Sequence, residues 1–318
     1  MRNKGNKGNK GICCIYMIKN WKSQVSEYIA KSKDPLLVVL GPTASGKTLF
    51  SIELAQYLKN ADVINADSRQ LYRGMDIGTA KVTEEEMQGV VHHLIDVLDP
   101  NEEATAGWYK KEAMSVIDSL KANGRIPILT GGSMLYLSTV IDDLSLAPVT
   151  DPELRERIMS EYELDSGQTL YKRLQSLDPE SAQIVDANNQ PHLVRAVEIC
   201  ELTGKTKAEA IQSNPTSDVL IFGIKREREE LVDRINLRVK VMFDAGWVDE
   251  VRALVAAGYT SEDPAMKSHG YKEIMQWIAD GETGSFEDLQ ESIAAKGRQY
   301  AKRQMTWWRG DERIVWLG

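Results

Sequence analysis

The amino-acid sequence predicts an α/β protein with a doubly wound parallel sheet and an inserted helical domain. Two observations predict the sheet. Short apolar segments of strand length alternate with amphipathic helical segments, and the first of them leads directly into a glycine-rich loop at residues 41–48. A third observation predicts the insertion, because residues from about 147 to 215 contain successive helical patterns with no strand between them. In such a sheet, ligands bind beyond the carboxyl ends of the strands.

The expected strands are short and apolar, as strands buried on both faces of a parallel sheet are. The clearest is Leu36–Leu40 (LLVVL), which is rich in branched side chains and ends at a glycine. The other expected strands are residues 62–65, 93–97, 125–130, 218–224 and 313–317. The helices expected around them are one that begins soon after Met17, with Trp21, Val25 and Ile29 on one face, and then 47–59, 105–122, 228–244, 247–257 and 285–304.

The insertion contains four expected helices, at residues 151–164, 167–177, 179–186 and 190–203. Asp178 and Pro179 are a good N-cap and first-turn pair, and Gly204 is a good helix stop. We therefore divide the chain into three parts. These are an N-terminal extension at 1–34, a core formed by 35–146 and 216–318, and a helical insertion at 147–215.

The composition is typical of a globular protein of about two domains. Of the 318 residues, 42% are hydrophobic and 27% are charged. The longest early apolar run, Gly11–Ile18, is too short for a membrane span, and no small-residue cleavage site follows it. The three cysteines, Cys13, Cys14 and Cys200, match neither a disulfide framework nor a zinc-binding pattern. We expect a cytoplasmic protein that does not bind membranes.

The charge distribution excludes a protein that is basic overall. The formal net charge is −8, so a nucleic-acid partner would need a local basic surface. Positive charge is concentrated in the first 22 residues, which contain no acid. The first ten residues are of low complexity, and we expect residues 1–16 to be disordered, with Met17 a candidate for the true start.

Residues 41–48 (GPTASGKT) match the pattern G-x-x-x-x-G-K-[ST] directly after a strand and directly before a helix. Glycines let the backbone amides surround an anion, and the helix N-terminus adds partial positive charge. Lys47 supplies a full charge to the terminal phosphate, and the Thr48 hydroxyl can hold a magnesium ion. The loop predicts a P-loop NTPase-like fold with a phosphate or diphosphate site. Its residues are Gly41, Pro42, Thr43, Ala44, Ser45, Gly46, Lys47 and Thr48.

The loop alone does not determine the reaction, since most such loops belong to nucleotide hydrolases and kinases. A hydrolase usually carries an acid at the end of a second apolar strand, but residues 126–130 lead into Gly131 and Gly132. The acid Asp67 instead follows the strand at 62–65. At that edge of the sheet it can face bound phosphates as a general base or substrate anchor, or it can be an N-cap for the next turn.

Five segments together resemble the bacterial tRNA dimethylallyltransferases, also called tRNA isopentenyltransferases. They are GPTASGKT (41–48), NADSRQLYRGMDIGTAK (65–81), HHLIDVLDP (92–100), RIPILTGGSMLY (125–136) and AKRQMTWWRG (301–310). GMDIGTAK is especially specific, and the insertion stands in the family's place. The resemblance implies transfer of a dimethylallyl group from dimethylallyl diphosphate to the exocyclic amine of the adenosine just 3′ of the anticodon in certain tRNAs.

The resemblance also gives roles to the site residues. Asp67 would take the proton of the amine, while Lys47, Thr48 and a magnesium ion would neutralise the leaving diphosphate. Arg234 and Arg238, one helical turn apart, match family arginines that approach the diphosphate, with Arg234 counted as catalytic and Arg238 as diphosphate-binding. Their other interpretation is a surface pair bridged to Glu230.

Contacts to the anticodon arm of tRNA are implied for a further set of residues. They are Asp67, Ser68, Arg69, Gln70, Ser133, Arg155, Pro191, His192, Leu193, Val194 and Arg195. Ser133 stands where the family more often has threonine, and it is also a possible helix N-cap. Arg155 alone could be a solvated charge. Pro191 and His192 replace a glutamine and a basic residue of the family pattern, so only Arg195 carries over directly in that segment.

Two features are left without a definite role. His269 stands where isoleucine or valine is commoner in the family. A C-terminal cluster could bind RNA or pack in the core, and it consists of Lys296, Arg298, Lys302, Arg303, Trp307, Trp308 and Arg309.

Three other functions remain open at this point. One is an adenylate isopentenyltransferase that acts on free AMP or ATP, although such enzymes typically lack the complete insertion and the Gly-Thr-Ala-Lys ending at 78–81. The others are a small-molecule kinase and an RNA-binding protein that uses the loop as a nucleotide-dependent switch. The chain ends without the zinc finger that eukaryotic relatives often append, which favours the bacterial type. We expect a monomer.

Overall fold

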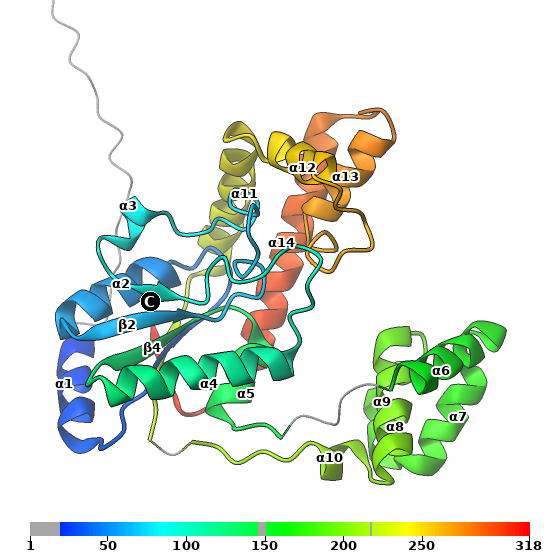
Figure 1. The fold of residues 1–318 in the computed structure, drawn as a ribbon, viewed down its shortest axis with the longest axis horizontal. Coiled ribbons are helices and arrows are strands. Elements are labelled where there is room, and N and C mark those ends of the chain that lie inside the picture. Colours follow the sequence, from blue (N-terminus) through cyan, green and yellow to red (C-terminus); the bar gives the residue numbers. More distant parts are fainter. Residues whose placement is uncertain (1–19, 146–150, 217) are drawn as a thin grey trace, which may run out of the picture.

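The computed structural model describes residues 20–145, 151–216 and 218–318, and its sheet is the one that the sequence predicts. Within these residues six parallel strands lie in the order β3-β2-β4-β1-β5-β6 (Figure 1). They are β1 (Leu37–Leu40), β2 (Ala61–Asn65), β3 (His92–His93), β4 (Ile126–Gly131), β5 (Leu220–Ile224) and β6 (Ile314–Leu317). The expectation that residues 1–16 are disordered concerns residues outside those described.

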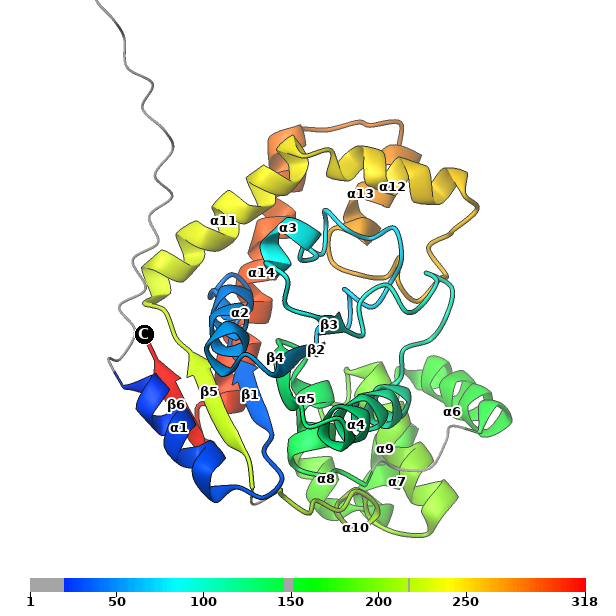
Figure 2. The same cartoon turned by 60° about the vertical axis from the view of Figure 1, so that its left-hand side comes forward.

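Helices cover both faces of the sheet (Figures 1 and 2). Those of the core are α1 (Trp21–Lys31), α2 (Lys47–Leu58), α3 (Glu84–Met87), α4 (Ala106–Ala122), α5 (Met134–Ile141), α11 (Arg228–Asp244), α12 (Trp247–Ala256), α13 (Tyr271–Ala279) and α14 (Phe286–Trp308). Those between the two halves of the core are α6 (Pro152–Asp165), α7 (Gln168–Leu177), α8 (Pro179–Ile184), α9 (Gln190–Thr203) and α10 (Lys207–Ala210).

The central strand β1 shows why its sequence is apolar throughout. Val38 and Leu40 join a core cluster with side chains of α4, α5 and α14, whereas Leu37 and Val39 join a second cluster with α1 and α2. Successive side chains of a strand point to opposite faces, so every position of β1 is buried. The sheet is therefore covered on both sides, and its carboxyl edge is the part available for a site.

One expected strand is largely wrong. The strand predicted at 93–97 is reduced to His92–His93, which pairs with β2. Leu94 and Asp96 have positive φ angles of 60° and 55°, which interrupt the extended chain. Leu94 and Leu98 are nevertheless buried, so the segment has the apolar pattern of a strand without its backbone.

The other predicted strands and helices are confirmed, with ends that differ by a few residues. The sequence did not predict α5, α13 or the one-turn helices α3 and α10. Most of α5 (MLYLSTVI) is buried, so it has no polar face from which a helical period could be recognised. The last helix, α14, continues to Trp308, which is buried, whereas the neighbouring Trp307 is 52% exposed.

The helices α6 to α9 pack around an apolar core of their own. Figure 1 shows this group set apart from the sheet. The described chain just before and just after the group lies side by side, since the backbone N–H of Ser145 donates to the carbonyl of Gln212 at 2.8 Å. The predicted N-cap Asp178 and helix stop Gly204 are confirmed. Where the insertion begins and ends as a domain stays a prediction.

Candidate active site

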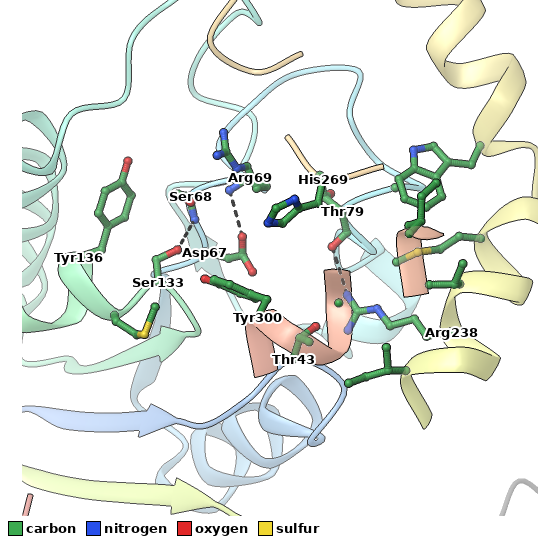
Figure 3. A pocket seen from close by; sticks show the side chains of 18 of the residues that line it. Thr43, Asp67, Ser68, Arg69, Thr79, Ser133, Tyr136, Arg238, His269 and Tyr300 are labelled. Atoms are coloured by element: carbon green, nitrogen blue, oxygen red, sulfur yellow. Dashed lines mark hydrogen bonds between the residues drawn. The ribbon is translucent and has the colours of Figure 1, made fainter. Parts of the chain in front are cut away.

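Two adjoining cavities lie at the carboxyl edge of the sheet. The first, of about 440 Å³, contains Lys47 and Thr48 in its wall and is called the loop cavity here. The second, of about 380 Å³, lies between the loop after β2 and the helices α5, α11 and α14, and is called the helix cavity (Figure 3). Both are lined by Thr43, Asp67, Arg238 and Tyr300, so the cavities meet at these four residues.

The loop at 41–48 has the backbone of an anion site. Gly41, Ala44 and Gly46 have φ angles of 145°, 61° and 100°, and such left-handed residues turn successive N–H groups toward one point. Gly41 admits no side chain, because a Cβ there would lie 2.6 Å from the carbonyl oxygen of Ile224. The buried hydroxyl of Ser45 has no hydrogen-bond partner within the described residues, as expected of a group that awaits a ligand.

Three side chains from distant parts of the chain hold this loop. Arg234 donates from Nε to the carbonyl of Ala44 at 2.7 Å, and Arg226 donates from Nε to the carbonyl of Ser45 at 3.1 Å. Gln304 on α14 is buried and accepts the N–H of Thr43 at 2.8 Å. Sequence reasoning missed Arg226 and Gln304. The position of Arg226 just beyond β5 was a usable signal, but nothing local to Gln304 indicates its role.

Two of the predicted cations, Lys47 and Arg238, are half-buried beside the cavities. Lys47 donates from Nζ to the carbonyl of Pro42 at 2.8 Å, and burial lowers its pKa to about 8, with Asp67 opposing the shift and Arg238 adding to it. Arg238 donates to the carbonyl of Thr79 at 3.2 Å, and burial lowers the pKa of its guanidinium. The surface-pair interpretation holds only in part. Arg234 approaches Glu230 at 3.9 Å, while Arg238 faces the cavities.

Asp67 is fixed in place with one oxygen left available. Its N–H donates to Asn65 Oδ1 at 3.0 Å, and its Oδ1 accepts the N–H of Arg69 at 2.9 Å. The carboxylate thus caps the next turn through Oδ1, as the sequence allowed. Its Oδ2 accepts no hydrogen bond from any described residue. Tyr300 lies on the same wall, and burial raises its pKa to about 12, so its phenol stays protonated at neutral pH.

Ser133 and Gln70 lie near the site, and their side chains hold neighbouring backbone segments in place. Ser133 occupies the N-cap position of α5, as the sequence allowed, but its hydroxyl makes no capping bond to the helix and instead accepts the N–H of Ser68 at 2.8 Å. This bond ties the residue next to Asp67 to the end of β4. Gln70 donates to the carbonyls of Thr79 and Ala80 at 3.2 and 3.1 Å, and so supports the neighbouring loop.

The specific segment GMDIGTAK folds as a loop held from α12. Glu250 accepts the N–H groups of Asp76, Ile77 and Gly78 at 2.7 to 3.1 Å. Gly78 lies against the indole of Trp247, where a Cβ would be only 1.9 Å away. The segment forms the cavity wall at Thr79, and its Gly78 permits the close approach of the Trp247 ring.

The helix cavity has one apolar and one polar side. The apolar side is formed by Ile235, Val239, Met242, Trp247 and Ile293 from α11, α12 and α14. The polar side carries Asp67, Ser68, Arg69, Ser133 and His269, and Figure 3 shows Asp67, Ser68, Arg69 and Ser133 grouped together. Sequence reasoning missed the apolar side, because its members have the helical spacing of ordinary core residues.

The predicted tRNA residues of the insertion lie elsewhere. Arg155 is on α6, while Pro191, His192 and Arg195 are on α9, and none of them lines either cavity. Pro191 and His192 are exposed, and Arg195 pairs with the buried Glu198 at 2.6 Å. Leu193 and Val194 require a correction. Their side chains are buried in the core of the insertion and hold α9 in place, so they offer RNA no side-chain surface.

The loop cavity offers oxygen ligands that suit magnesium. The Thr48 hydroxyl and the Asp67 carboxylate both line it, and hard cations prefer such oxygens. Among the described residues no group of three His, Cys, Asp or Glu side chains could hold a metal unaided. A magnesium ion here would therefore complete its shell with phosphate and water oxygens.

No helix in the described ranges is both long enough and apolar enough to cross a membrane. The sequence model described as IPP transferase matches residues 70–311. The tRNA dimethylallyltransferases of Corynebacterium jeikeium and Streptomyces griseus are 40% and 45% identical to the chain, over 88% and 89% of it and 90% of each relative.

Two solved structures are similar over most of the chain. The full-length tRNA isopentenylpyrophosphate transferase from Bacillus halodurans has 37% identity and a TM-score of 0.65, and the match covers 89% of each chain. A eukaryotic dimethylallyltransferase described as acting on tRNA has 27% identity and a TM-score of 0.74, over 89% of this chain and 74% of its own. The chain therefore belongs to the IPP transferase family.

Proposed function

We propose that this protein transfers a dimethylallyl group from dimethylallyl diphosphate to the exocyclic amine of the adenosine just 3′ of the anticodon in tRNA, and releases diphosphate. One observation carries the proposal: an anion-binding loop cavity and a half-apolar helix cavity meet at Asp67. The donor has a charged end and an apolar end, and the acceptor has an amine that must lose a proton. The site offers a matching group to each of them.

The diphosphate would occupy the loop cavity. The backbone of the loop, Lys47 and Arg238 provide positive potential there, and both side chains are held before a ligand arrives. Such preorganised charge stabilises the negative charge that develops on the leaving group. A magnesium ion held by Thr48 and the phosphate oxygens would add Lewis-acid stabilisation of the same charge.

The dimethylallyl group would lie against the apolar side of the helix cavity. On α11 Ile235 lies about one turn before Arg238, and Val239 and Met242 follow it, so the apolar chain would begin beside the cation that holds the diphosphate. An allylic carbon that loses diphosphate carries delocalised positive charge, so the protein must mainly position the reactants and stabilise charge. The apolar walls would also keep water from the cation.

The acceptor base would enter from the polar side. As the new bond forms between the amine nitrogen and the allylic carbon, the bond from that carbon to the diphosphate oxygen breaks, and Asp67 Oδ2 takes the amine proton. Asp67 is suited to this because the hydrogen bond from Arg69 holds its other oxygen. The base must leave its stack to reach the cavity, as in other enzymes that modify bases.

The insertion would bind the anticodon arm, with Arg155 and Arg195 among its contacts. The proposal rests on the separate core of α6 to α9 and on the exposure of the α9 N-terminus. We expect such a protein to work in the cytoplasm, where tRNA is modified, and as a monomer.

The direct test is to incubate the protein and magnesium with dimethylallyl diphosphate labelled in the prenyl group, and to offer tRNA, AMP or ATP as acceptor. Label in the adenosine 3′ of the anticodon is the expected result. Label in AMP or ATP would identify an adenylate isopentenyltransferase. Absence of prenyl transfer to any acceptor, together with phosphate transfer from ATP to a small molecule, would identify a kinase.

The role of the insertion has its own test. Deleting residues 151–210 and bridging the ends should abolish tRNA binding in an electrophoretic shift assay, yet leave diphosphate binding measurable by calorimetry. Loss of diphosphate binding with tRNA binding intact, in a variant whose circular dichroism shows a folded core, would reverse the two roles. Affinity of the intact protein for tRNA should also fall steeply with salt, because phosphate contacts release counterions.

A further inference from the structure

His269 lines the helix cavity, and the proposed chemistry gives it no role. It lies in the short segment between α12 and α13. Its neighbours Met266, Ser268 and Gly270 are buried, while His269 itself is exposed. In Figure 3 its imidazole points into the cavity, toward the side on which Asp67 and Tyr300 lie. Its ring meets that of Tyr300 edge-on, with centroids 6.3 Å apart.

The segment that carries His269 is held firmly. Ser268 is 2% exposed, and its backbone carbonyl accepts the N–H of Lys272 at 3.1 Å. Gly270 has a φ angle of 86° and packs against Trp247, where a Cβ would be 2.0 Å from the ring. The backbone on both sides of His269 therefore has little freedom, so the direction of its Cα–Cβ bond is built into the fold.

The ring nitrogens of His269 are available to a ligand. Within the described residues neither of them makes a hydrogen bond, in contrast to His92 and His93, which each bond to protein oxygens. Although the residue as a whole is exposed, desolvation of the part of the ring that lies against the cavity wall lowers the pKa of His269. The cations of Arg303, Arg69 and Lys296 lower it further, and Glu273 opposes them. At neutral pH the ring is therefore neutral, with one N–H donor and one acceptor nitrogen.

We propose that His269 determines specificity for the acceptor base by donating a hydrogen bond to a ring nitrogen beside the exocyclic amine, N1 or N7 of adenine. This inference rests on the proposed function. Asp67 would accept the amine proton, and His269 would donate a hydrogen bond to the flanking ring nitrogen. Together the two side chains would recognise a donor next to an acceptor on the base. Guanine has a carbonyl in place of the amine, so Asp67 would face an oxygen and the pair would reject it.

The test uses synthetic anticodon stem-loop RNAs that carry adenosine, 1-deazaadenosine or 7-deazaadenosine at the target position. Each deaza base lacks one acceptor nitrogen. For the wild-type protein, one of them should raise KM about tenfold, the usual effect of losing a single hydrogen bond, with kcat within about threefold. His269→Leu should raise KM for the adenosine RNA by a similar factor and should no longer distinguish it from that deaza RNA.

Two further variants separate recognition from structure. His269→Gln keeps a donor and should retain most of the affinity and part of the discrimination. Lys267→Leu changes an exposed neighbour that pairs with Glu262, and any effect on KM should be equal for all three RNAs. The inference is overturned if wild type treats both deaza RNAs like adenosine, or if His269→Leu keeps the discrimination. Failure of wild type to prenylate the adenosine RNA would instead overturn the proposed function.

Discussion

The two ends of the site are built in different ways. The anion site of the loop cavity is formed mainly by one contiguous segment, residues 41–48, whose backbone conformation and lysine face it, although Asp67 and Arg238 line the same cavity. The helix cavity is assembled from side chains that follow β2, begin α5, and project from α11, α12 and α14. A contiguous site can be recognised from sequence, whereas an assembled one depends on the whole fold. The two also differ in what they should bind, a diphosphate at one end and a base with a prenyl group at the other.

The largest effect is expected where the two ends meet. Asp67→Asn keeps the shape and the hydrogen bond to Arg69 but removes the proton acceptor. Single-turnover transfer should fall by about 10²–10⁴-fold, the range for loss of a general base, while the dissociation constant of tRNA changes only a few-fold. The same substitution at Asp99, an exposed acid paired with Arg73, is the control and should be neutral. A defect that saturating tRNA repairs would mean that Asp67 only anchors the base.

A slightly smaller loss is expected at the loop end. Lys47→Ala removes a half-buried charge that would face the leaving group, and kcat/KM for dimethylallyl diphosphate should fall about 10²-fold or more. Lys240→Ala on α11 removes an exposed charge of the same sign and should leave the rate unchanged. Transfer by Lys47→Ala at the wild-type rate would show that the loop does not hold the diphosphate.

The pH dependence of donor binding should also come from the loop end. Lys47 is charged below its pKa of about 8 and neutral above it, so its attraction for the diphosphate is present at pH 7 and lost as pH rises. KM for dimethylallyl diphosphate should therefore increase roughly tenfold between pH 7 and pH 9. Steady-state kinetics at saturating tRNA would measure this. Lys47→Ala should bind weakly at both pH values, and an equal pH dependence in that variant would assign the effect to another group.

The smallest effect is expected at the connection between the two ends. Gln304 joins the loop to the end of β4, since it accepts the N–H of Thr43 and donates to the carbonyl of Gly132 at 2.7 Å. Gln304→Met leaves a buried donor unpaired and should lower the free energy of unfolding by about 1–3 kcal/mol. The melting temperature should then fall by several degrees. Gln276→Met on α13 is the matched control, because the exposed Gln276 side chain bonds among the described residues only to Asp280.

The sequence predicted the sheet, the phosphate loop and Asp67, because each has a local pattern with a direct physical meaning. It did not predict that Gln304, Arg226 and Tyr300 complete the site, since their roles arise only when α14 and the segment after β5 pack beside the loop. It assigned Leu193 and Val194 to RNA by their place in a motif, although apolar residues at adjacent positions of a helix more often enter a core, as these do.

The central claim is that diphosphate and RNA bind at separate ends that meet at Asp67. It is tested most directly by measuring two dissociation constants, one for a non-reactive thiodiphosphate analogue of the donor and one for the anticodon stem-loop RNA, in Lys47→Ala and in His269→Leu. Lys47→Ala should weaken only the donor analogue, and His269→Leu should weaken only the RNA. If each variant weakened both ligands equally while remaining folded, the two ends would not be separate and the account would be contradicted.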